Sequence, residues 1–311
     1  MTTSKPLLCS LIGIALLFPT LLRAGNPAPK PLPEPLHQAA PKPKPKPKPA
    51  PGRPSEEEPL RPVASAFTFE IGRQSALDTY LSPIRYSGLD VALGYERLRA
   101  AGFAPEKWLT RHNASVNFAS MNNQSGSGAM MSLYLDYSFA MLRRWQLGRG
   151  LWLAGGGEAA LTLGGLYNLR NSNNPATAKV AIDLGATAMA SYHLRVGRLP
   201  LTFRYQVSLP VVGAFFSPAF GQSYYEMFYI GNTAGIVHFG AWHNRVDLRN
   251  YLSVDIHVGK RALRLGYRQL MRTTHVNHLD TQVLGHMFVL GISGEIFRSA
   301  PPARRVVSVY N

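Results

Sequence analysis

The strict alternation of apolar and polar residues over most of the chain limits its fold more than any other feature. In residues 201–209, LTFRYQVSL, every odd position is apolar and every even position is polar. Residues 133–141 and 248–258 follow the same period of two. Successive side chains of a β-strand point to opposite faces of the sheet, so this period predicts strands that each have one apolar and one polar face.

Similar runs predict further strands at residues 66–74, 87–99, 110–121, 151–166, 178–195, 261–275 and 286–297. The best count is ten strands, with residues 211–245 treated as one elaborate outer loop. A count of twelve stays open, because IVHFGAW (236–242) could form pairs of its own. Helical periodicity is nearly absent. The predicted fold class is all-β.

The connections between these strands alternate in character. One set is short and basic, and comprises residues 97–107, 143–150, 195–200 and 258–262. The other set is polar, longer or both, and comprises residues 74–88, 122–129, 168–178, the stretch after Pro210 and residues 274–285. Short turns alternating with longer loops are typical of an antiparallel up-and-down transmembrane β-barrel, with the turns on the periplasmic side.

A membrane barrel also explains why the polar faces carry many paired opposite charges. Such a barrel turns its apolar face to lipid, and every backbone group is paired because the closed sheet has no edge. Tryptophans anchor at the membrane interface, and the three beside the proposed periplasmic turns are predicted to do so: Trp108, Trp145 and Trp152. The alternative is a soluble secreted protein, lipocalin-like or a sandwich, whose strands would be shorter.

The polar faces predict a lumen filled with charge. The strand phase points these residues inward: Glu70, Asp90, Glu96, Asp136, Glu158, Asp183, Arg204, Asp247, Arg249, Asp255, His257, Arg264, Arg268, Arg272 and Glu295, with Arg111 and Lys179. About ten strands enclose a bore little wider than side chains can fill. Confined charges must pair, because an isolated buried ion is very costly. We therefore expect an ionic plug, with a narrow wetted channel as the alternative.

The ends of the chain differ from the barrel region, which we place at residues 65–298. Residues 1–24 combine Lys5, a short apolar run and the small Ala24, as in a cleaved signal peptide; the competing interpretation is a retained anchor. Residues 25–64, with the run PKPKPKPKPAP, predict a disordered Pro/Lys-rich periplasmic linker or a specific ligand for a partner. Residues 299–311 form a C-terminal tail.

The formal net charge of +16 suggests polyanionic partners. An exported chain rarely meets nucleic acid, so we expect no nucleic-acid partner. We expect contact with outer-membrane lipid and lipopolysaccharide, with peptidoglycan or another envelope protein as further candidates. The single cysteine, Cys9, lies in the predicted signal peptide, so the mature chain has no thiol chemistry.

No pattern in the sequence predicts an enzyme, a metal site or a cofactor. Asp255 and His257 resemble the acid and imidazole of an outer-membrane hydrolase, but they lie next to a predicted periplasmic turn, where we expect a structural pair. His275, His278, Asp280 and His286 have no spacing specific for a metal. Residues 155–165, GGGEAALTLGG, lack the Lys-Ser/Thr of a phosphate-binding loop.

Three segments resemble an uncharacterised outer-membrane barrel family of the Bacteroidota, known as a domain of unknown function. These are LDTYLSPIRYSGLDVALGYERLR (77–99), FGAWHNRVDLRNYLSVDIHVGKRALRLGY (239–267) and LGHMFVLGISGEIF (284–297). The resemblance covers nearly all of residues 66–297 and implies a barrel fold, with no activity or catalytic residues to carry over. We expect a non-enzymatic structural or interaction role in the envelope; the alternatives are a narrow, anion-preferring solute channel and, third, a hydrolase.

Overall fold

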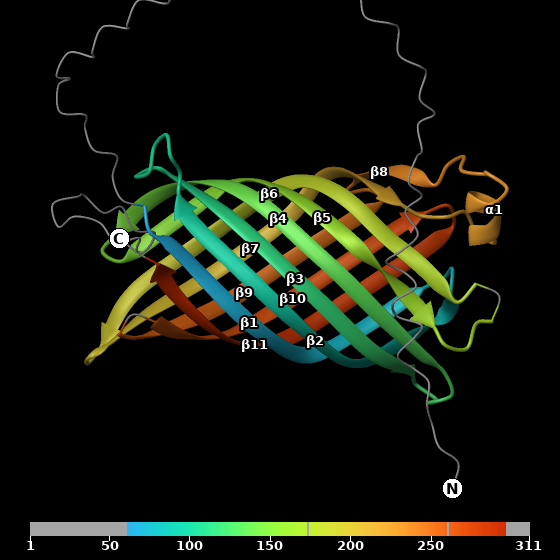
Figure 1. Cartoon of the computed structure of the whole chain (residues 1–311), viewed down its shortest axis with the longest axis horizontal. Helices are drawn as coiled ribbons and strands as arrows, with labels where there is room; N and C mark the ends of the chain where they lie inside the picture. The colour runs from blue at the N-terminus through green and yellow to red at the C-terminus, as the bar shows by residue number, and fades with distance from the viewer. Residues whose placement is uncertain (1–60, 173, 260, 297–311) are drawn as a thin grey trace, which may run out of the picture. The chain divides into compact units, whose positions relative to one another are not determined.

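The computed structural model describes residues 61–172, 174–259 and 261–296, and these form a closed antiparallel barrel (Figure 1). Its elements are β1 (Val63–Asp78), β2 (Ser82–Ala100), β3 (Trp108–Asn123), β4 (Ala129–Gly148), β5 (Leu151–Asn168), β6 (Ala176–Val196), β7 (Leu199–Phe216), α1 (Tyr224–Phe228), β8 (Val237–Ala241), β9 (Arg245–Val258), β10 (Arg261–Val276) and β11 (Leu279–Ile296). The predicted all-β barrel fold is confirmed.

Ten strands close the barrel in the order β1 to β7, then β9, β10 and β11, which returns to β1. The predicted count of ten is confirmed. β8 is a short addition: β7 pairs with β9 from Leu201 to Ser208 and with β8 from Val212 to Phe216. The segment 236–242 therefore pairs locally, as its alternation allowed, without adding a member to the ring.

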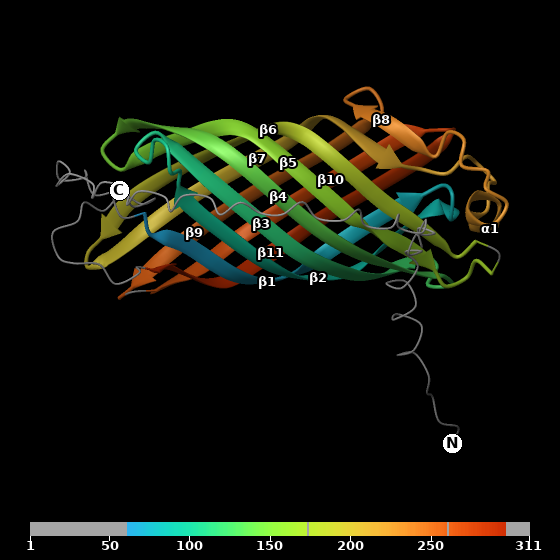
Figure 2. The same cartoon turned by 45° about the horizontal axis from the view of Figure 1, so that its top comes forward.

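Both ends of the described chain lie at the same end of the barrel, because Val63 of β1 pairs with Ile296 of β11. We call this the terminus end, and the opposite one the loop end. Figures 1 and 2 show the long strands inclined to the barrel axis, with α1 and β8 at the loop end. Among the described residues, no helix is long and apolar enough to cross a membrane.

Two expected long loops are in fact strand, so the prediction of loop length is wrong there. β1 continues to Asp78 and β2 begins at Ser82, within the expected loop 74–88. In the expected loop 274–285, a tight turn joins β10 to β11, with Asn277 and His278 at φ values of 55° and 60°. Two positive φ values fit a type I′ hairpin turn, whose twist suits the flanking strands. The backbones of the polar residues in these two segments still form strand pairs with the neighbouring strands.

Tight turns at the terminus end explain the short basic connections. Gly150, Gly197 and Gly259 lie next to strand ends and have φ values between 61° and 77°, a conformation that glycine adopts without strain.

The predicted barrel boundary at residue 65 lies two residues inside β1. The predicted signal peptide, the linker up to residue 60 and the tail lie outside the described residues.

Candidate functional site

The strand register places a continuous set of charged side chains on the inner face of the barrel. Most of the predicted lumen residues are buried: Glu70, Asp90, Glu96, Glu158, Asp183, Arg204, Asp247, Asp255 and Arg264, with Arg272 at 5% exposure. Asp136, Arg249, His257 and Arg268 are half-buried on the same face. Glu295 lies in β11, but its side chain is outside the described residues.

Three ion pairs join strands on opposite sides of the ring. Arg204 of β7 contacts Glu96 of β2 at 2.9 Å. Arg272 of β10 contacts Asp136 of β4 at 2.8 Å, and Lys179 of β6 contacts Asp78 of β1 at 2.7 Å. Each pair of strands is five steps apart in the ring of ten, so each salt bridge crosses the full bore. The lumen is therefore crossed at three levels.

The network nearest the terminus end is built around Glu96. Its Oε1 accepts hydrogen bonds from Arg204 and Arg264, each at 2.9 Å, and its Oε2 accepts from Gln206 at 2.9 Å. Arg264 also donates to both carboxylate oxygens of Asp255, at 2.6 and 2.8 Å. A two-point guanidinium–carboxylate contact of this kind is stronger and more directional than a single hydrogen bond.

The network nearer the loop end is built around Asp247, which is fully buried. Arg249 and Arg272 contact its Oδ2 at 2.9 and 3.0 Å, and Arg245 lies 3.7 Å away. Arg245 also binds Asp183, with distances of 2.8 and 3.1 Å. One carboxylate thus faces three guanidinium groups, each of which has a second carboxylate partner.

The interior charges nearly cancel. The carboxylates are Glu70, Asp78, Asp90, Glu96, Asp136, Glu158, Asp183, Asp247 and Asp255, and the cations paired with them are Arg111, Lys179, Arg204, Arg245, Arg249, Arg264, Arg268 and Arg272. Nine negative and eight positive groups leave one negative charge in this network, and the buried guanidinium of Arg144, outside the network, offsets it. The excess of positive charge in the whole sequence therefore does not come from this network.

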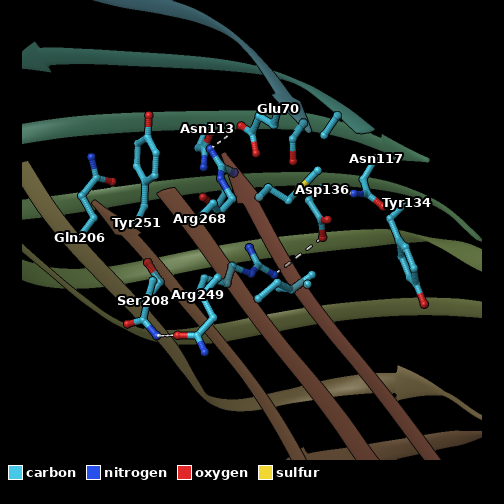
Figure 3. A pocket seen from close by; sticks show the side chains of 18 of the residues that line it. Glu70, Asn113, Asn117, Tyr134, Asp136, Gln206, Ser208, Arg249, Tyr251 and Arg268 are labelled. Carbon is cyan, nitrogen blue, oxygen red and sulfur yellow. Dashed lines mark hydrogen bonds and ion pairs between the residues drawn. The ribbon is translucent and has the colours of Figure 1, made fainter. Parts of the chain in front are cut away.

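A cavity of about 80 Å³ lies between the two networks and is bordered mostly by polar residues, among them Asp90, Asn117, Tyr251 and Arg268. In Figure 3, Glu70 and Arg268 point toward one another across one side of it, and their ion pair measures 2.9 Å. A cavity needs roughly 10–15 Å³ for each water molecule, so this one has room for several. Several buried atoms around it have no partner among the described residues: Asn117 Oδ1, Tyr134 OH, Tyr251 OH, Arg268 Nε and Arg272 Nη1. Donors and acceptors mixed in this way suit water.

Asp90 differs from the other interior carboxylates. It is 1% exposed and accepts a hydrogen bond from Asn117 at 2.5 Å. Within the described part of the chain, no cation lies within 4 Å of it. Its carboxyl group borders the cavity, where water could solvate it.

Apolar side chains cover the charged networks toward both ends of the barrel. At the terminus end they are Ala64, Leu98, Ala100, Leu109, Ala140, Leu142, Ala154 and Met189. At the loop end they are Ala76, Leu81, Tyr86, Ala119, Met121, Met130, Tyr134, Leu166 and Val283. The alternation pattern did not separate these layers from the charged ones, because small and apolar residues also occupy inward positions.

The segment between β7 and β9 contacts the rim at the loop end. Met227 of α1 is fully buried, and Tyr224 OH accepts a hydrogen bond from the amide of Ala178 at 2.5 Å. Tyr80 OH donates to the carbonyl of Gln222 at 2.7 Å. Burial, together with the nearby Tyr224 and Asp78, raises the pKa of Tyr80 to about 12, so the phenol stays a donor at neutral pH.

Asp255 and His257 have separate partners. Arg264 holds both oxygens of Asp255, whereas His257 Nε2 lies 2.8 Å from the Thr202 hydroxyl. Thr202 also contacts His193 Nδ1 at 2.9 Å. In the described ranges no group of three or more His, Cys, Asp and Glu side chains is arranged to hold a metal ion. His275 contacts Asp280 at 2.5 Å, and His286 contacts the Tyr267 hydroxyl at 2.6 Å.

The three tryptophans occupy two different faces. Trp108 and Trp145 lie on the outward phase of β3 and β4 near the terminus end, and Trp145 is 45% exposed. Trp152 shares the inward phase of Ala154 and Glu158, and the guanidinium of Arg144 lies 5.0 Å from its ring. The structure therefore places Trp152 inside the barrel rather than toward lipid, because Arg144, buried on the neighbouring strand, stacks on it.

Three charged interior residues were missed by sequence reasoning: Asp78, Arg144 and Arg245. Asp78 and Arg245 were placed in loops, and Arg144 in a turn. The signal that could have found them is the strand phase: Asp78 is eight residues after Glu70, and Arg245 is two residues before Asp247.

The solved structures to which the chain is similar include autotransporter domains and an outer membrane channel. The transport unit of the autotransporter AIDA-I from Escherichia coli is 11% identical, with 80% of this chain and 93% of that chain covered and a TM-score of 0.46. The translocator domain of NalP from Neisseria meningitidis is 11% identical (78% and 88% covered, TM-score 0.37). An outer membrane channel from Pseudomonas putida F1 is 9% identical (79% and 100% covered, TM-score 0.32).

In sequence, no curated protein matches the chain. A family model does match it, over residues 42–301, which includes every described strand. The predicted membership in a family of unknown function is thereby confirmed, whereas the Bacteroidota source stays a prediction. The chain belongs to the family described as protein of unknown function (DUF3316).

Proposed function

We propose that the protein is an outer-membrane β-barrel with a sealed lumen and a structural or interaction role in the cell envelope, without enzymatic activity. The observation that carries this proposal is the set of three ion pairs that cross the bore, at 2.7 to 2.9 Å. A contact of that length between opposite strands places side-chain atoms across the bore at its level. Apolar layers on both sides add to the seal.

The outer membrane is the location that best suits this surface. Large apolar side chains such as Phe67, Leu93 and Phe288 are exposed by 63% to 71% on the outward faces of the strands. An exposed apolar band of this kind is unfavourable in water and is normal for a barrel in lipid. The terminus end then faces the periplasm, so that the Pro/Lys-rich segment can reach peptidoglycan or another envelope protein.

The conductance of the full-length, refolded protein in planar bilayers tests the seal. We expect no steady conductance from the intact protein. We also expect none when residues 219–235 are replaced by a short Gly-Ser linker, because the crossing ion pairs lie beneath that segment. Slower migration after boiling, together with protease protection in vesicles, verifies folding and insertion. Steady single-channel currents from the intact protein would contradict the proposal.

A narrow channel is the second candidate, and the central cavity favours it. The cavity is bordered mostly by polar residues, including Asp90, and some of their side-chain atoms can bind water. Opening would require the three crossing ion pairs to separate. If the intact protein does conduct, exchange of Arg272 for Met should change its ion selectivity, since this guanidinium lines the cavity.

The proposal of no enzymatic role is supported by the partners of Asp255 and His257. Arg264 binds both carboxylate oxygens of Asp255, whereas in a catalytic pair that carboxylate would accept a hydrogen bond from the imidazole of His257. Alanine replacement of both Asp255 and His257 should leave the lipid profile of the cells unchanged. Loss of a specific lipid hydrolysis product, with the barrel still folded, would instead support the hydrolase.

A further inference from the structure

We propose that the outer face of β2, β3 and β4 at the terminus end binds the phosphate of an anionic glycerophospholipid. The site consists of Arg97 and Arg143, flanked by the aromatic side chains of Trp108 and Trp145. It is independent of the sealed lumen, because all four residues lie on the outward phase of their strands.

The strand register places these residues on the same part of the outer face. Trp108 of β3 pairs directly with Arg143 of β4, and Arg97 of β2 pairs with His112 of β3. The guanidinium of Arg143 lies 5.7 Å from the ring of Trp145. β2 and β4 are two strand spacings apart, or roughly 10 Å, and His112 and Trp108 are four residues apart, or about 13 Å, so the Cα atoms of Arg97 and Arg143 are separated by roughly 16 Å. Two arginine side chains that extend toward one another can reach one group between them.

Both guanidinium groups lack a carboxylate partner. In the described ranges, no ion pair or side-chain hydrogen bond involves Arg97 or Arg143. Arginines in the lumen, in contrast, form ion pairs with aspartate or glutamate. Glu106 lies in the neighbouring turn, where its carbonyl accepts from the inward-facing Arg144. A phosphate would supply the missing acceptor, and arginine binds phosphate with two parallel hydrogen bonds.

The position along the strands fits a lipid headgroup. Leu93, Val116 and Leu135 form one outward row across β2, β3 and β4, with exposures of 45% to 63%. Arg97 lies four residues from Leu93 and Arg143 eight residues from Leu135, which is about 13 and 26 Å along the strands. At a tilt of roughly 40° these become about 10 and 20 Å, so both arginines lie nearer the terminus end than the apolar row, toward the edge of an apolar band about 25 Å tall.

Aromatic rings support the same assignment. Trp145 is 45% exposed, and Phe103, in the turn between β2 and β3, is 67% exposed and 6.1 Å from Trp108. Indole rings prefer the interface between hydrocarbon and headgroups. Acyl chains of the bound lipid would lie along Val116 and Leu135, with the phosphate at the two arginines. The charge and depth favour a lipid over a soluble polyanion.

Native mass spectrometry of the delipidated, folded full-length protein tests the site. With phosphatidylglycerol we expect a one-to-one complex, and with phosphatidylcholine of the same acyl chains a much smaller bound fraction. The double exchange R97Q/R143Q should weaken phosphatidylglycerol binding about tenfold, since two charges near the headgroup are removed. Slower migration after boiling confirms that each variant has folded.

R261Q is the matched control. Arg261 is an exposed outward residue at the same end of β10, beside Val258 and Gly294 and away from Trp108 and Trp145. Its exchange should leave binding unchanged. Equal losses in R261Q and R97Q/R143Q would show diffuse charge attraction rather than a site. Equal binding of both lipids, or full binding by R97Q/R143Q, would also overturn the proposal.

Discussion

At the scale of single residues, Arg264 is the side chain whose removal should cost most. It contacts Asp255 at 2.6 Å and Glu96 at 2.9 Å, and it is 1% exposed. In R264M both carboxylates lose a buried partner, and breaking such a pair typically costs 3–5 kcal/mol. We expect a loss of that size in the free energy of unfolding, measured by urea titration in lipid vesicles with tryptophan fluorescence.

R261M is the control for this loss. Arg261 lies three residues earlier on β10 but is exposed on the outward phase. A surface exchange of this kind usually changes stability by less than about 0.5 kcal/mol. If both variants lost the same stability, the interior network would contribute no more than an exposed arginine does.

Tyr80 gives a second prediction at this scale. Its pKa of about 12 lies above the usual value of 10, so folding favours the protonated phenol. This contribution to stability is complete below pH 10 and is lost as the pH rises through 12. Between pH 7 and 9 the hydrogen bond to Gln222 should therefore not change. Ionisation of Tyr80 should therefore not change the rate at which chymotrypsin cuts residues 219–235 in this pH range.

The exchange Y80F removes that hydrogen bond and keeps the ring. A net hydrogen bond is worth about 1 kcal/mol, so cleavage of residues 219–235 should become roughly fivefold faster. Y229F is the control, because Tyr229 is 77% exposed and its hydroxyl makes no hydrogen bond to another described residue. Equal cleavage rates in Y80F and the unchanged protein would mean that other contacts, such as Met227, hold the segment.

At the scale of elements, β5 packs so closely on β4 that some of its glycines are required. A Cβ on Gly156 would lie 1.9 Å from the carbonyl oxygen of Met141, whereas one on Gly157 would meet only Gly185 O at 4.0 Å. We expect G156A to lose about 1–3 kcal/mol through overpacking and G157A to lose almost nothing. Urea titration of both variants measures the difference, and equal stability would refute this account of the close approach.

The strands were predictable because each carries its own period. Leu201 to Leu209 could be assigned to β7, with Arg204 and Gln206 inward, from the alternation alone. Strand ends were less predictable. Residues 74–88 and 274–285 contain turn-forming types, yet hairpin pairing continues through most of them, because the closed ladder stabilises polar residues that have weak strand preference.

At the scale of the whole molecule, the ion-pair partners could not be predicted. Sequence phase shows that Glu96 and Arg204 both point inward, but their contact depends on which strands lie five steps apart and on the stagger of the closed ring. The same geometry lets Arg272 contact Asp136 on the opposite side of the ring as well as Asp247 on the neighbouring strand. Closure of the barrel therefore supplies the information that the strand pattern lacks.

The orientation of the barrel in the membrane gives the last prediction. The proposal places the turn 124–128 outside the cell and the turn at Arg149 and Gly150 in the periplasm. The variants S125C and R149C, made after exchange of Cys9 for Ser, present single thiols at exposed positions of these two turns. A membrane-impermeant maleimide should label S125C in intact cells, and R149C only after the outer membrane is permeabilised. The reverse labelling pattern would mean that the barrel has the opposite orientation, with the Pro/Lys-rich segment outside the cell, where it could not reach peptidoglycan. It would also put Arg97 and Arg143 at the outer leaflet, beside the phosphates of lipopolysaccharide rather than those of glycerophospholipids.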